Sequence, residues 1–328
     1  MGEPLDDEPA LAGPRVAVAL RWPRPNERAA IDRPSWTGVR AIDALLTLGR
    51  GARIGIFGAP GCGKTTLLES IVDGCAADAV VVALVGERGR EAQHWLARRN
   101  ERTTVICATS DRQAGERVAA AHVAFAQAVA LRRRGLHVLL VLDSLARTAA
   151  ALREIAVGRG ESIGRGGYPP SVFGEMARIV EIGGALSSGS ITLVATVLSD
   201  GDERDPVSDA ARSLLDGHIA LSAQLAHAGH FPAIDVLQST SRTMERVTDE
   251  THRRRAQRLR RALAVLKESE DARALGITPQ GEELRAAIAV ERPIEAFLCQ
   301  GHEWADARTT LAQLAELVEQ LEAAHGDR

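Results

Sequence analysis

The stretch over residues 58–65 constrains this chain more than any other part of its sequence. It reads Gly-Ala-Pro-Gly-Cys-Gly-Lys-Thr, which fits the pattern G-x-x-x-x-G-K-T. An apolar run over residues 53–57 precedes it, and a helix-like segment over residues 66–72 follows it. A strand, a glycine loop and a helix start in this order form a cradle for the phosphates of a nucleotide. The flanking strand and helix favour this phosphate loop over the alternative, a glycine turn that binds nothing.

Two side chains of the loop are suited to a nucleotide with magnesium. Lys64 can reach the β- and γ-phosphates, and the Thr65 hydroxyl can complete a Mg²⁺ shell. The residues that we expect to contact the bound nucleotide are Gly58, Ala59, Pro60, Gly61, Cys62, Gly63, Lys64, Thr65 and Thr66.

Four further apolar runs predict a mainly parallel sheet. They are rich in β-branched residues and cover residues 79–85, 103–108, 138–142 and 191–197. Such continuous runs are typical of strands that are buried on both faces of a parallel sheet. Amphipathic helices are predicted between them, over Gln113–Arg134 and Ser171–Leu186. This βαβ succession predicts an α/β fold with ligands at the carboxyl ends of the strands.

The chain divides into three parts by composition. Residues 1–30 carry prolines, charges and one short strand-like run over residues 15–20, and are predicted to form a tail. Residues 31–247 form the α/β domain. Residues 248–328 contain Ala-, Leu-, Arg- and Glu-rich segments with helical periodicity, which predict a small all-helical carboxyl-terminal domain. Its helical segments are residues 250–271, 281–300 and 306–324.

Composition excludes several classes of protein. The net charge of -3 gives no overall attraction to nucleic acid. The four cysteines lack C-x-x-C spacing, which argues against a disulfide scaffold or zinc site and favours a reducing compartment. The first residues lack the order of a signal peptide, and no apolar run reaches the ~20 residues of a membrane span. A cytoplasmic protein is therefore expected.

Two acidic residues follow predicted strands at the edge where the phosphate loop lies. Asp143 ends the run over residues 138–142 and suits a magnesium-organising role; the alternative is a helix N-cap. Glu87 follows the run over residues 79–85, where a carboxylate could orient the attacking water; the alternative is an exposed charged turn. Arg88 and Arg147 lie at the same edge and suit phosphate charge, with surface salt bridges as the alternative.

Several motifs in order resemble the type III secretion and flagellar export ATPases, which are RecA-fold relatives of the catalytic subunit of rotary ATP synthases. The similarity runs from about Ile31 to about Gln300. Besides the phosphate loop, the motifs are Thr37–Asp43, Gly86–Glu91, Asp143-Ser144 with Arg147, Gly167–Phe173, Leu215–Ile219 and Phe231–Arg242. The resemblance implies a RecA-like P-loop core with a mainly parallel sheet, followed by a small helical domain.

The resemblance also implies residue roles in hydrolysis of ATP with Mg²⁺. Glu87 matches the catalytic glutamate, Asp143 matches the metal-organising aspartate, and Arg88 and Arg147 match arginines near the terminal phosphate. Arg242 resembles the arginine finger that completes the active site of a neighbouring subunit, which implies a homo-hexameric ring.

Two aromatic residues match the base pocket of that family. Phe231 stands where the family usually has a tyrosine that packs on adenine, and a phenylalanine keeps the stacking face. Phe297 is expected to close the adenine pocket from the helical domain. A plain core position is the alternative for each of them.

The implied function is to energise bacterial protein export through an injectisome or flagellar apparatus, with release or unfolding of chaperone-bound substrates. The expected partners are further copies of the chain, stalk and stator proteins, secretion substrates and chaperones. The expected location is the cytoplasm, peripheral to the inner-membrane export apparatus. The competing functions are a rotary ion-pumping subunit, a RecA-type nucleic-acid motor and a non-hydrolysing ring scaffold.

Two features bear on these alternatives. Family members carry an amino-terminal β-barrel domain where about 30 residues stand here, so a truncated chain, a misplaced start and a different assembly are all open. The arginine-rich run over residues 252–261 invites a nucleic-acid interpretation, but its arginines circle a helix and no aromatic platform accompanies them. A solvated helix is favoured, with contact to acidic proteins next.

Overall fold

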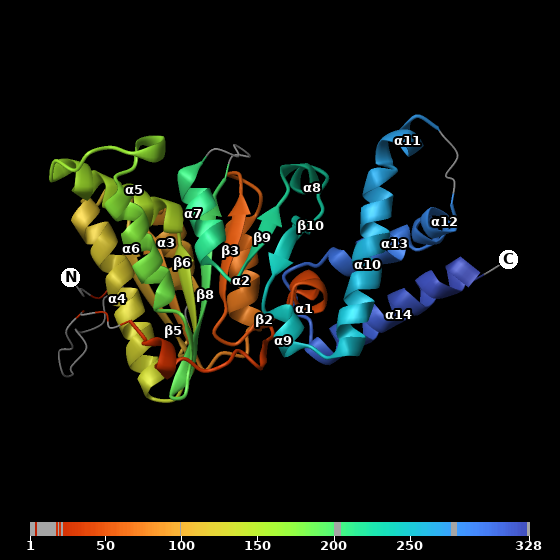
Figure 1. The fold of residues 1–328 in the computed structure, drawn as a ribbon, viewed down its shortest axis with the longest axis horizontal. Helices are drawn as coiled ribbons and strands as arrows, with labels where there is room; N and C mark the ends of the chain where they lie inside the picture. Colours follow the sequence, from red (N-terminus) through yellow and green to blue (C-terminus); the bar gives the residue numbers. More distant parts are fainter. Residues whose placement is uncertain are drawn as a thin grey trace. The chain divides into compact units, whose positions relative to one another are not determined.

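The apolar runs predicted as strands form the central sheet of the first of two compact units (Figure 1). In this computed structural model, residues 4, 18, 20, 22–98, 100–199, 205–276 and 281–326 are described. The first unit contains Met1–Ala30, Arg50–Phe57 and Ala77–Leu215, and the second contains Ile31–Gly49, Gly58–Ala76 and Asp216–Arg328. Each unit is therefore assembled from segments that are far apart in the sequence.

The sheet of the first unit has the strand order β3-β8-β6-β4-β5. These strands are β3 (Arg53–Gly58), β8 (Gly189–Leu198), β6 (His137–Asp143), β4 (Ala79–Val85) and β5 (Thr103–Ala108). β4 runs parallel to both β5 and β6, and β6 runs parallel to β8. Residues 80–85 are all fully buried, which explains why the strand sequences show no alternation of polar and apolar residues. The predicted parallel sheet is confirmed.

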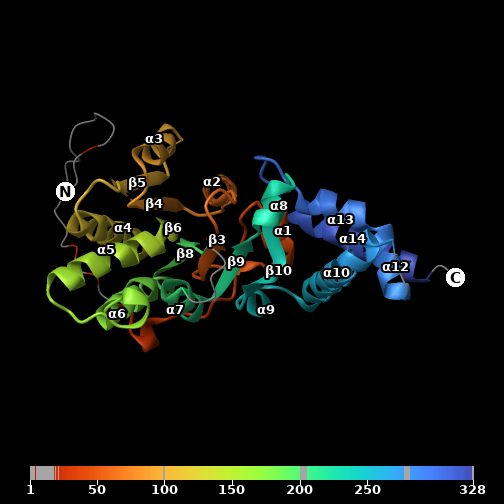
Figure 2. The ribbon, with the colours of Figure 1, turned by 90° about the horizontal axis from the view of Figure 1, so that it is seen from above.

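Five helices accompany these strands in the described part of the first unit. They are α3 (Gly89–Ala97), α4 (Ala114–Arg133), α5 (Leu145–Gly158), α6 (Pro170–Glu181) and α7 (Pro206–Leu214), with a 3-10 turn at Arg165–Gly167 and another at Pro25–Glu27. α4 packs on β4, β5 and β6, with Phe125 fully buried beside Ala121 and Ala124. α4, α5 and α6 lie side by side (Figure 2).

The helix expected over Ser171–Leu186 is too long at its carboxyl end. α6 ends at Glu181, and Gly184–Leu186 form β7, which pairs antiparallel with β8. Gly184 has a φ of +133°, a conformation that side chains other than glycine rarely adopt. The Gly183-Gly184 pair therefore ends the helix and starts a hairpin, which the helical pattern of the preceding residues concealed.

The second unit surrounds the phosphate loop with short elements. These are β1 (Pro34–Ser35), α1 (Arg40–Leu45), β2 (Leu48–Gly49), α2 (Lys64–Gly74), β9 (Gly217–Leu221), α8 (Ala223–His227), β10 (Ile234–Ser241) and α9 (Met244–Val247). β1 pairs antiparallel with β2, and β9 pairs antiparallel with β10. The short helix expected before the first core strand is α1. The antiparallel β9–β10 pair has no counterpart in the sequence prediction.

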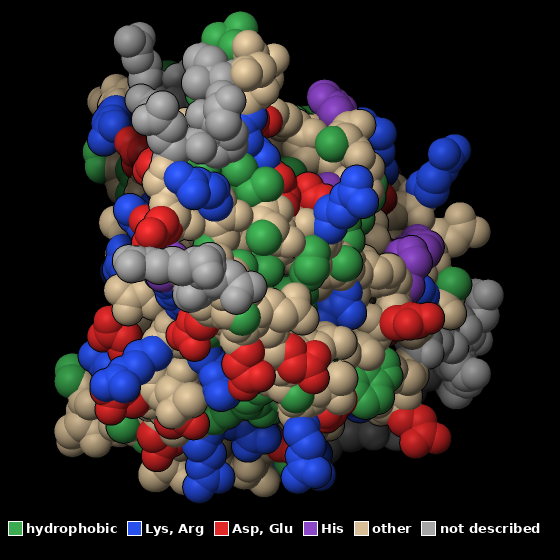
Figure 3. All heavy atoms as spheres, turned by 90° about the vertical axis from the view of Figure 1, so that its right-hand side faces the viewer, with side chains coloured by type: hydrophobic (Ala, Val, Ile, Leu, Met, Phe, Trp, Pro, Cys, Tyr) green, Lys and Arg blue, Asp and Glu red, His purple; other side chains and the backbone are tan. Residues whose placement is uncertain are grey.

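The carboxyl-terminal region is helical, as predicted. It contains α10 (Glu250–Glu268), α11 (Glu270–Ala274), α12 (Glu282–Ala289), α13 (Glu291–Leu298) and α14 (Ala307–Gly326). α10 packs against α12 and α14, and Leu259 of α10 is buried, as are Leu314 and Leu321 of α14. On the face shown in Figure 3, acidic and basic side chains are mixed around scattered hydrophobic ones, and no charge of one sign dominates.

The predicted domain boundary at residue 247 and the predicted tail over residues 1–30 stay predictions. The two compact units are a different division of the chain, because the second unit joins the helical region to residues 31–49 and 58–76. The strand-like run over residues 15–20 lies outside the described residues except for Val18 and Leu20. Among the helices of the described residues, none combines the length and the apolar character that crossing a bilayer requires.

Candidate active site

The phosphate loop has the backbone that its glycines predict. Gly61 and Gly63 have φ values of +85° and +83°, in the left-handed region that glycine adopts at little cost. Gly63 is the N-cap residue of α2, which starts at Lys64. The loop therefore leads directly into the amino terminus of an 11-residue helix, where backbone N–H groups and the helix dipole favour an anion.

Lys64 lies across this loop. Its Nζ donates to the carbonyl oxygen of Gly58 at 2.8 Å and to that of Ala59 at 2.7 Å. Thr65 is half-buried, while Cys62 is 3% exposed. The lysine ammonium is thus held at the loop by backbone carbonyl groups.

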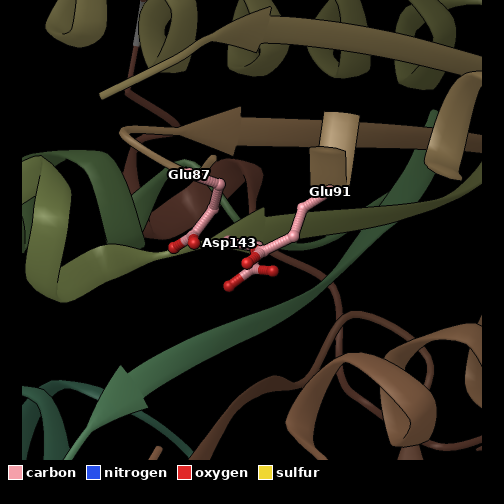
Figure 4. A group of neighbouring side chains, drawn as sticks. All are labelled: Glu87, Glu91 and Asp143. Atoms are coloured by element: carbon pink, nitrogen blue, oxygen red, sulfur yellow. The ribbon is translucent and has the colours of Figure 1, made fainter. Parts of the chain in front are cut away.

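In the first unit, three carboxylates converge. Glu87, Glu91 and Asp143 each offer an oxygen, and these oxygens all lie within 4.8 Å of one another (Figure 4). Asp143 is the last residue of β6, and its strand partner in β4 is Leu84, shortly before Glu87. The parallel register of β4 and β6 therefore brings together the two acids that the strand ends predicted.

The surroundings of Glu87 strongly raise the pKa of its carboxyl group. This side chain is buried, with the residue 6% exposed, so the alternative of an exposed charged turn is wrong. Burial, followed by the negative charge of Asp143, raises the pKa of Glu87 to about 8, while the Arg147 guanidinium acts in the opposite direction. Arg147 Nε lies 2.7 Å from Glu87 Oε1. A carboxyl group with a pKa near 8 can exchange a proton at neutral pH.

The start of α5 tests the alternative role of Asp143 as a helix N-cap. The N-cap of α5 is Ser144, whose hydroxyl accepts from the Arg147 backbone N–H at 3.2 Å. The N-cap role considered for Asp143 is therefore wrong. Thr196 Oγ1 donates to Asp143 Oδ1 at 2.5 Å, which orients the carboxylate at the end of β6.

The arginines near this cluster have different surroundings. Arg147 pairs with buried Glu87, which is not an ordinary surface salt bridge. Arg88 is the exposed N-cap residue of α3, and its guanidinium has no ion-pair partner among the described residues.

Glu91 is a member of the cluster that the sequence reasoning did not single out. It lies in the first turn of α3. Its spacing of four residues from Glu87 is the feature of the sequence that could have predicted its place in the cluster.

The two phenylalanines lie in contrasting surroundings in the second unit. Phe231 is 43% exposed, and its ring lies 3.5 Å from the position that a β-carbon on Gly63 would occupy. Phe231 is therefore not a plain core residue. Phe297 of α13 is 5% exposed, and the Arg40 guanidinium carbon lies 5.9 Å from its ring centre. Its burial favours the core alternative.

Arg242 follows β10 and is exposed. Its backbone N–H donates to the Asp216 carbonyl at 2.9 Å, which fixes the main chain. Within the described part of the chain, no carboxylate pairs with its guanidinium group.

Several arginines of helix α10 have partners within the chain. Arg254 pairs with Glu250, and Arg261 Nε lies 3.0 Å from Glu283 Oε1. Arg253 donates to backbone carbonyl groups. These contacts favour the solvated-helix interpretation.

Comparisons with known proteins identify the family that this chain resembles. The model of the ATP synthase alpha/beta family, nucleotide-binding domain, matches residues 38–241, and that of the T3SS EscN ATPase C-terminal domain matches residues 248–316. The type 3 secretion system ATPase of Pseudomonas syringae pv. syringae is 45% identical, covering 98% of this chain and 75% of that protein. The flagellum-specific ATP synthase of Treponema pallidum is 42% identical, covering 96% and 74%.

A solved structure is similar over nearly the whole chain. The assembled ATPase EscN in complex with its central stalk EscO, from the enteropathogenic E. coli type III secretion system, superposes with a TM-score of 0.87 at 39% identity. The match covers 95% of this chain and 78% of that one.

Proposed function

This chain belongs to the type III secretion ATPases of the ATP synthase alpha/beta family, and on that premise we propose that its ATP hydrolysis energises bacterial protein export. The fold is the P-loop ATPase fold of that family, with its helical carboxyl-terminal region. The export apparatus is an injectisome or a flagellum, since relatives of both kinds are similar to this chain. The match of residues 248–316 to the EscN model favours export over a rotary ion pump.

The observation that carries the proposed chemistry is the environment of Glu87. It is a buried carboxyl group with a pKa near 8, beside Asp143 and Arg147. We assign Glu87 as the base that orients the attacking water and accepts its proton; it acts in this role as the ionised carboxylate, the form that the neighbouring Arg147 guanidinium favours. Arg147 holds this carboxyl group in place through their ion pair.

The donor atoms near Glu87 fit magnesium. The carboxylates of Glu87, Glu91 and Asp143 supply the oxygen ligands that this ion prefers. Asp143 and Thr65 are the proposed metal-organising residues. When bound, magnesium neutralises charge on the phosphates of ATP.

The remaining residues are proposed to bind the phosphates and the adenine of ATP. Lys64 and the backbone of residues 58–66 bind the phosphates, and Arg88 offsets charge on the terminal phosphate. Phe231 packs on adenine, for which its exposed ring beside Gly63 is suited. Although its burial favours a core position, Phe297 of α13 is the residue that we propose closes the same pocket from the helical region.

We propose a homo-hexameric ring in which Arg242 acts on the site of the neighbouring subunit. An exposed arginine without a carboxylate partner among the described residues is available for such a contact. The similar EscN structure is an assembly with a central stalk, so a stalk protein is a proposed partner here, together with a stator, secretion substrates and chaperones. The proposed location is the cytoplasmic side of the inner-membrane export apparatus.

The catalytic assignment is tested with Glu87→Gln, compared with Glu316→Gln on the exposed side of α14. We expect Glu87→Gln to lower magnesium-dependent ATP turnover at least about 100-fold with little change in ATP affinity, because a general base is lost. The control should retain full turnover. Near-normal turnover of Glu87→Gln would show that another group activates water.

The export assignment is tested in the bacterium that encodes the chain. Replacing the chromosomal gene with the Glu87→Gln variant should abolish secretion of type III substrates at normal protein levels. Secretion at the parental level would contradict the proposed function.

A further inference from the structure

Gln300 joins three segments of the second unit. It lies in the loop between α13 and α14. Its Oε1 accepts from the Arg40 backbone N–H at 2.8 Å, and its Nε2 donates to the Gly38 carbonyl at 2.7 Å and to the Glu303 carbonyl at 2.5 Å. Its own backbone N–H donates to the Phe231 carbonyl at 2.8 Å. Both ends of the side-chain amide are therefore satisfied, and they fix the orientation of this loop residue.

The segment that carries Phe231 is attached to this loop at two points. The first is the hydrogen bond from the Gln300 backbone to the Phe231 carbonyl. The second is the contact between Cys299 Sγ and His230 Nδ1, which lie 3.2 Å apart. Phe231 is 43% exposed, so few packing contacts fix its ring. The position of the ring therefore depends on these two attachments of the backbone.

On its other side, Gln300 holds a turn that packs against the end of the phosphate-loop helix. The Gly38 carbonyl accepts from Gln300 and also from the Ala305 backbone N–H at 2.8 Å. A β-carbon on Gly38 would lie only 3.0 Å from the Cα atom of Gly74, the last residue of α2. This backbone contact ties the turn to the helix that starts at Lys64.

Asp43 makes the turn rigid. Its carboxylate accepts from the Thr37 backbone N–H and hydroxyl, each at 2.8 Å, and from the Gly38 backbone N–H at 2.9 Å. The turn is thus a fixed support, to which Gln300 attaches the Phe231 segment.

We propose that Gln300 is a positioning residue for the nucleotide base. It sets the place of the Phe231 ring relative to the phosphate loop by linking the Phe231 backbone to the turn that packs on α2. This inference rests on the proposed function, in which the Phe231 ring contacts adenine. Its consequence is specific: loss of the Gln300 amide weakens the part of binding that depends on the base and leaves the phosphate-dependent part unchanged.

The test compares Gln300→Met, which keeps the length of the side chain but removes its hydrogen bonds, with Gln313→Met as a control. Gln313 and Gln300 line one surface hollow, and the Gln313 side chain forms no hydrogen bond with a described residue. We expect Gln300→Met to weaken ATP binding about 10-fold and to raise KM with little change in kcat, because hydrogen bonds that place the ring are lost. Affinity for tripolyphosphate, which lacks a base, should not change.

A second variant protects this test against misfolding. Gln300→Glu retains the acceptor for Arg40 but places a carboxylate oxygen against the Gly38 and Glu303 carbonyl oxygens, so a loss of ATP affinity at least as large as that of Gln300→Met is expected. Thermal unfolding checks that each variant is folded. Equal losses of affinity for ATP and tripolyphosphate in the folded variants would overturn the proposal, as would unchanged ATP affinity.

Phe231→Ala separates failure of this inference from failure of the proposed function. If Phe231→Ala leaves ATP affinity unchanged, the proposed base contact is wrong. If Phe231→Ala weakens ATP binding but Gln300→Met does not, only the role of Gln300 is wrong. If Gln300 acts through Phe231, Gln300→Met should cause no further loss in the Phe231→Ala background.

Discussion

At the scale of single residues, Glu87 shows how the fold changes the chemistry of a side chain. A glutamate in water has a pKa near 4.5, whereas burial beside Asp143 raises it to about 8 here. The position of Glu87 after a strand follows from the sequence, and so does that of Asp143. The ion pair with Arg147 and the approach of Glu91 depend on how α3 and α5 pack, which residue spacing alone does not determine.

The raised pKa of Glu87 predicts a pH-dependent stability. A carboxyl group whose pKa is higher in the folded state than in the unfolded state favours the fold while it is protonated, and this contribution is lost as pH rises toward 8. Glu87→Gln mimics the protonated form. We therefore expect the variant to unfold at a higher temperature than the parent at pH 9, without nucleotide, and at nearly the same temperature at pH 5.

Thermal unfolding at the two pH values measures this difference. Glu316→Gln is the control and should unfold like the parent at both. A Glu87→Gln effect of the same size at pH 5 and pH 9 would mean that ionisation of Glu87 is not its cause.

At the scale of elements, the sequence pattern predicted the strands and helices whose bounds depend on the burial of their own residues. The strands β4 and β5 have the bounds that their apolar runs predicted, because burial on both faces demands continuous apolar sequence. The helix over residues 171–186 was overextended because Ala185 and Leu186 continue its apolar pattern, while the Gly183-Gly184 break and pairing with β8 decide the structure. The β9–β10 pair was missed because its register is irregular between Asp235 and Thr240.

Close contact between elements predicts opposite effects for two glycine substitutions in helices. A β-carbon on Gly74 of α2 would lie 2.4 Å from the Thr37 carbonyl oxygen, so Gly74→Ala should destabilise the fold by about 1–3 kcal/mol. Gly174 in α6 is exposed and has no neighbouring atom within 4 Å of such a carbon. Gly174→Ala should stabilise the fold by up to about 1 kcal/mol, because alanine favours helix.

Urea unfolding of the two variants and the parent provides the measurement. The two midpoints of unfolding should move in opposite directions. If Gly74→Ala were as stable as the parent, the turn at residues 37–38 would not be fixed against α2.

At the scale of the whole molecule, the described chain supplies a phosphate loop, a buried base and an exposed arginine, which the proposal combines across subunits. Glu87 and Arg242 are then both required, but a working site takes them from different chains. Loss of either should abolish turnover, and Arg242→Ala should retain ATP binding. Turnover per subunit should also rise with protein concentration, because a monomer lacks the neighbouring arginine.

The most direct test of this central claim is the ATP turnover of mixed assemblies, made by co-expressing the Glu87→Gln and Arg242→Ala variants. Each variant alone should be inactive. In an equal random mixture, about a quarter of the sites combine an intact Glu87 with an intact Arg242 from the neighbour, so about a quarter of parental turnover should return. Mixed assemblies that form but stay inactive would contradict an active site shared between subunits.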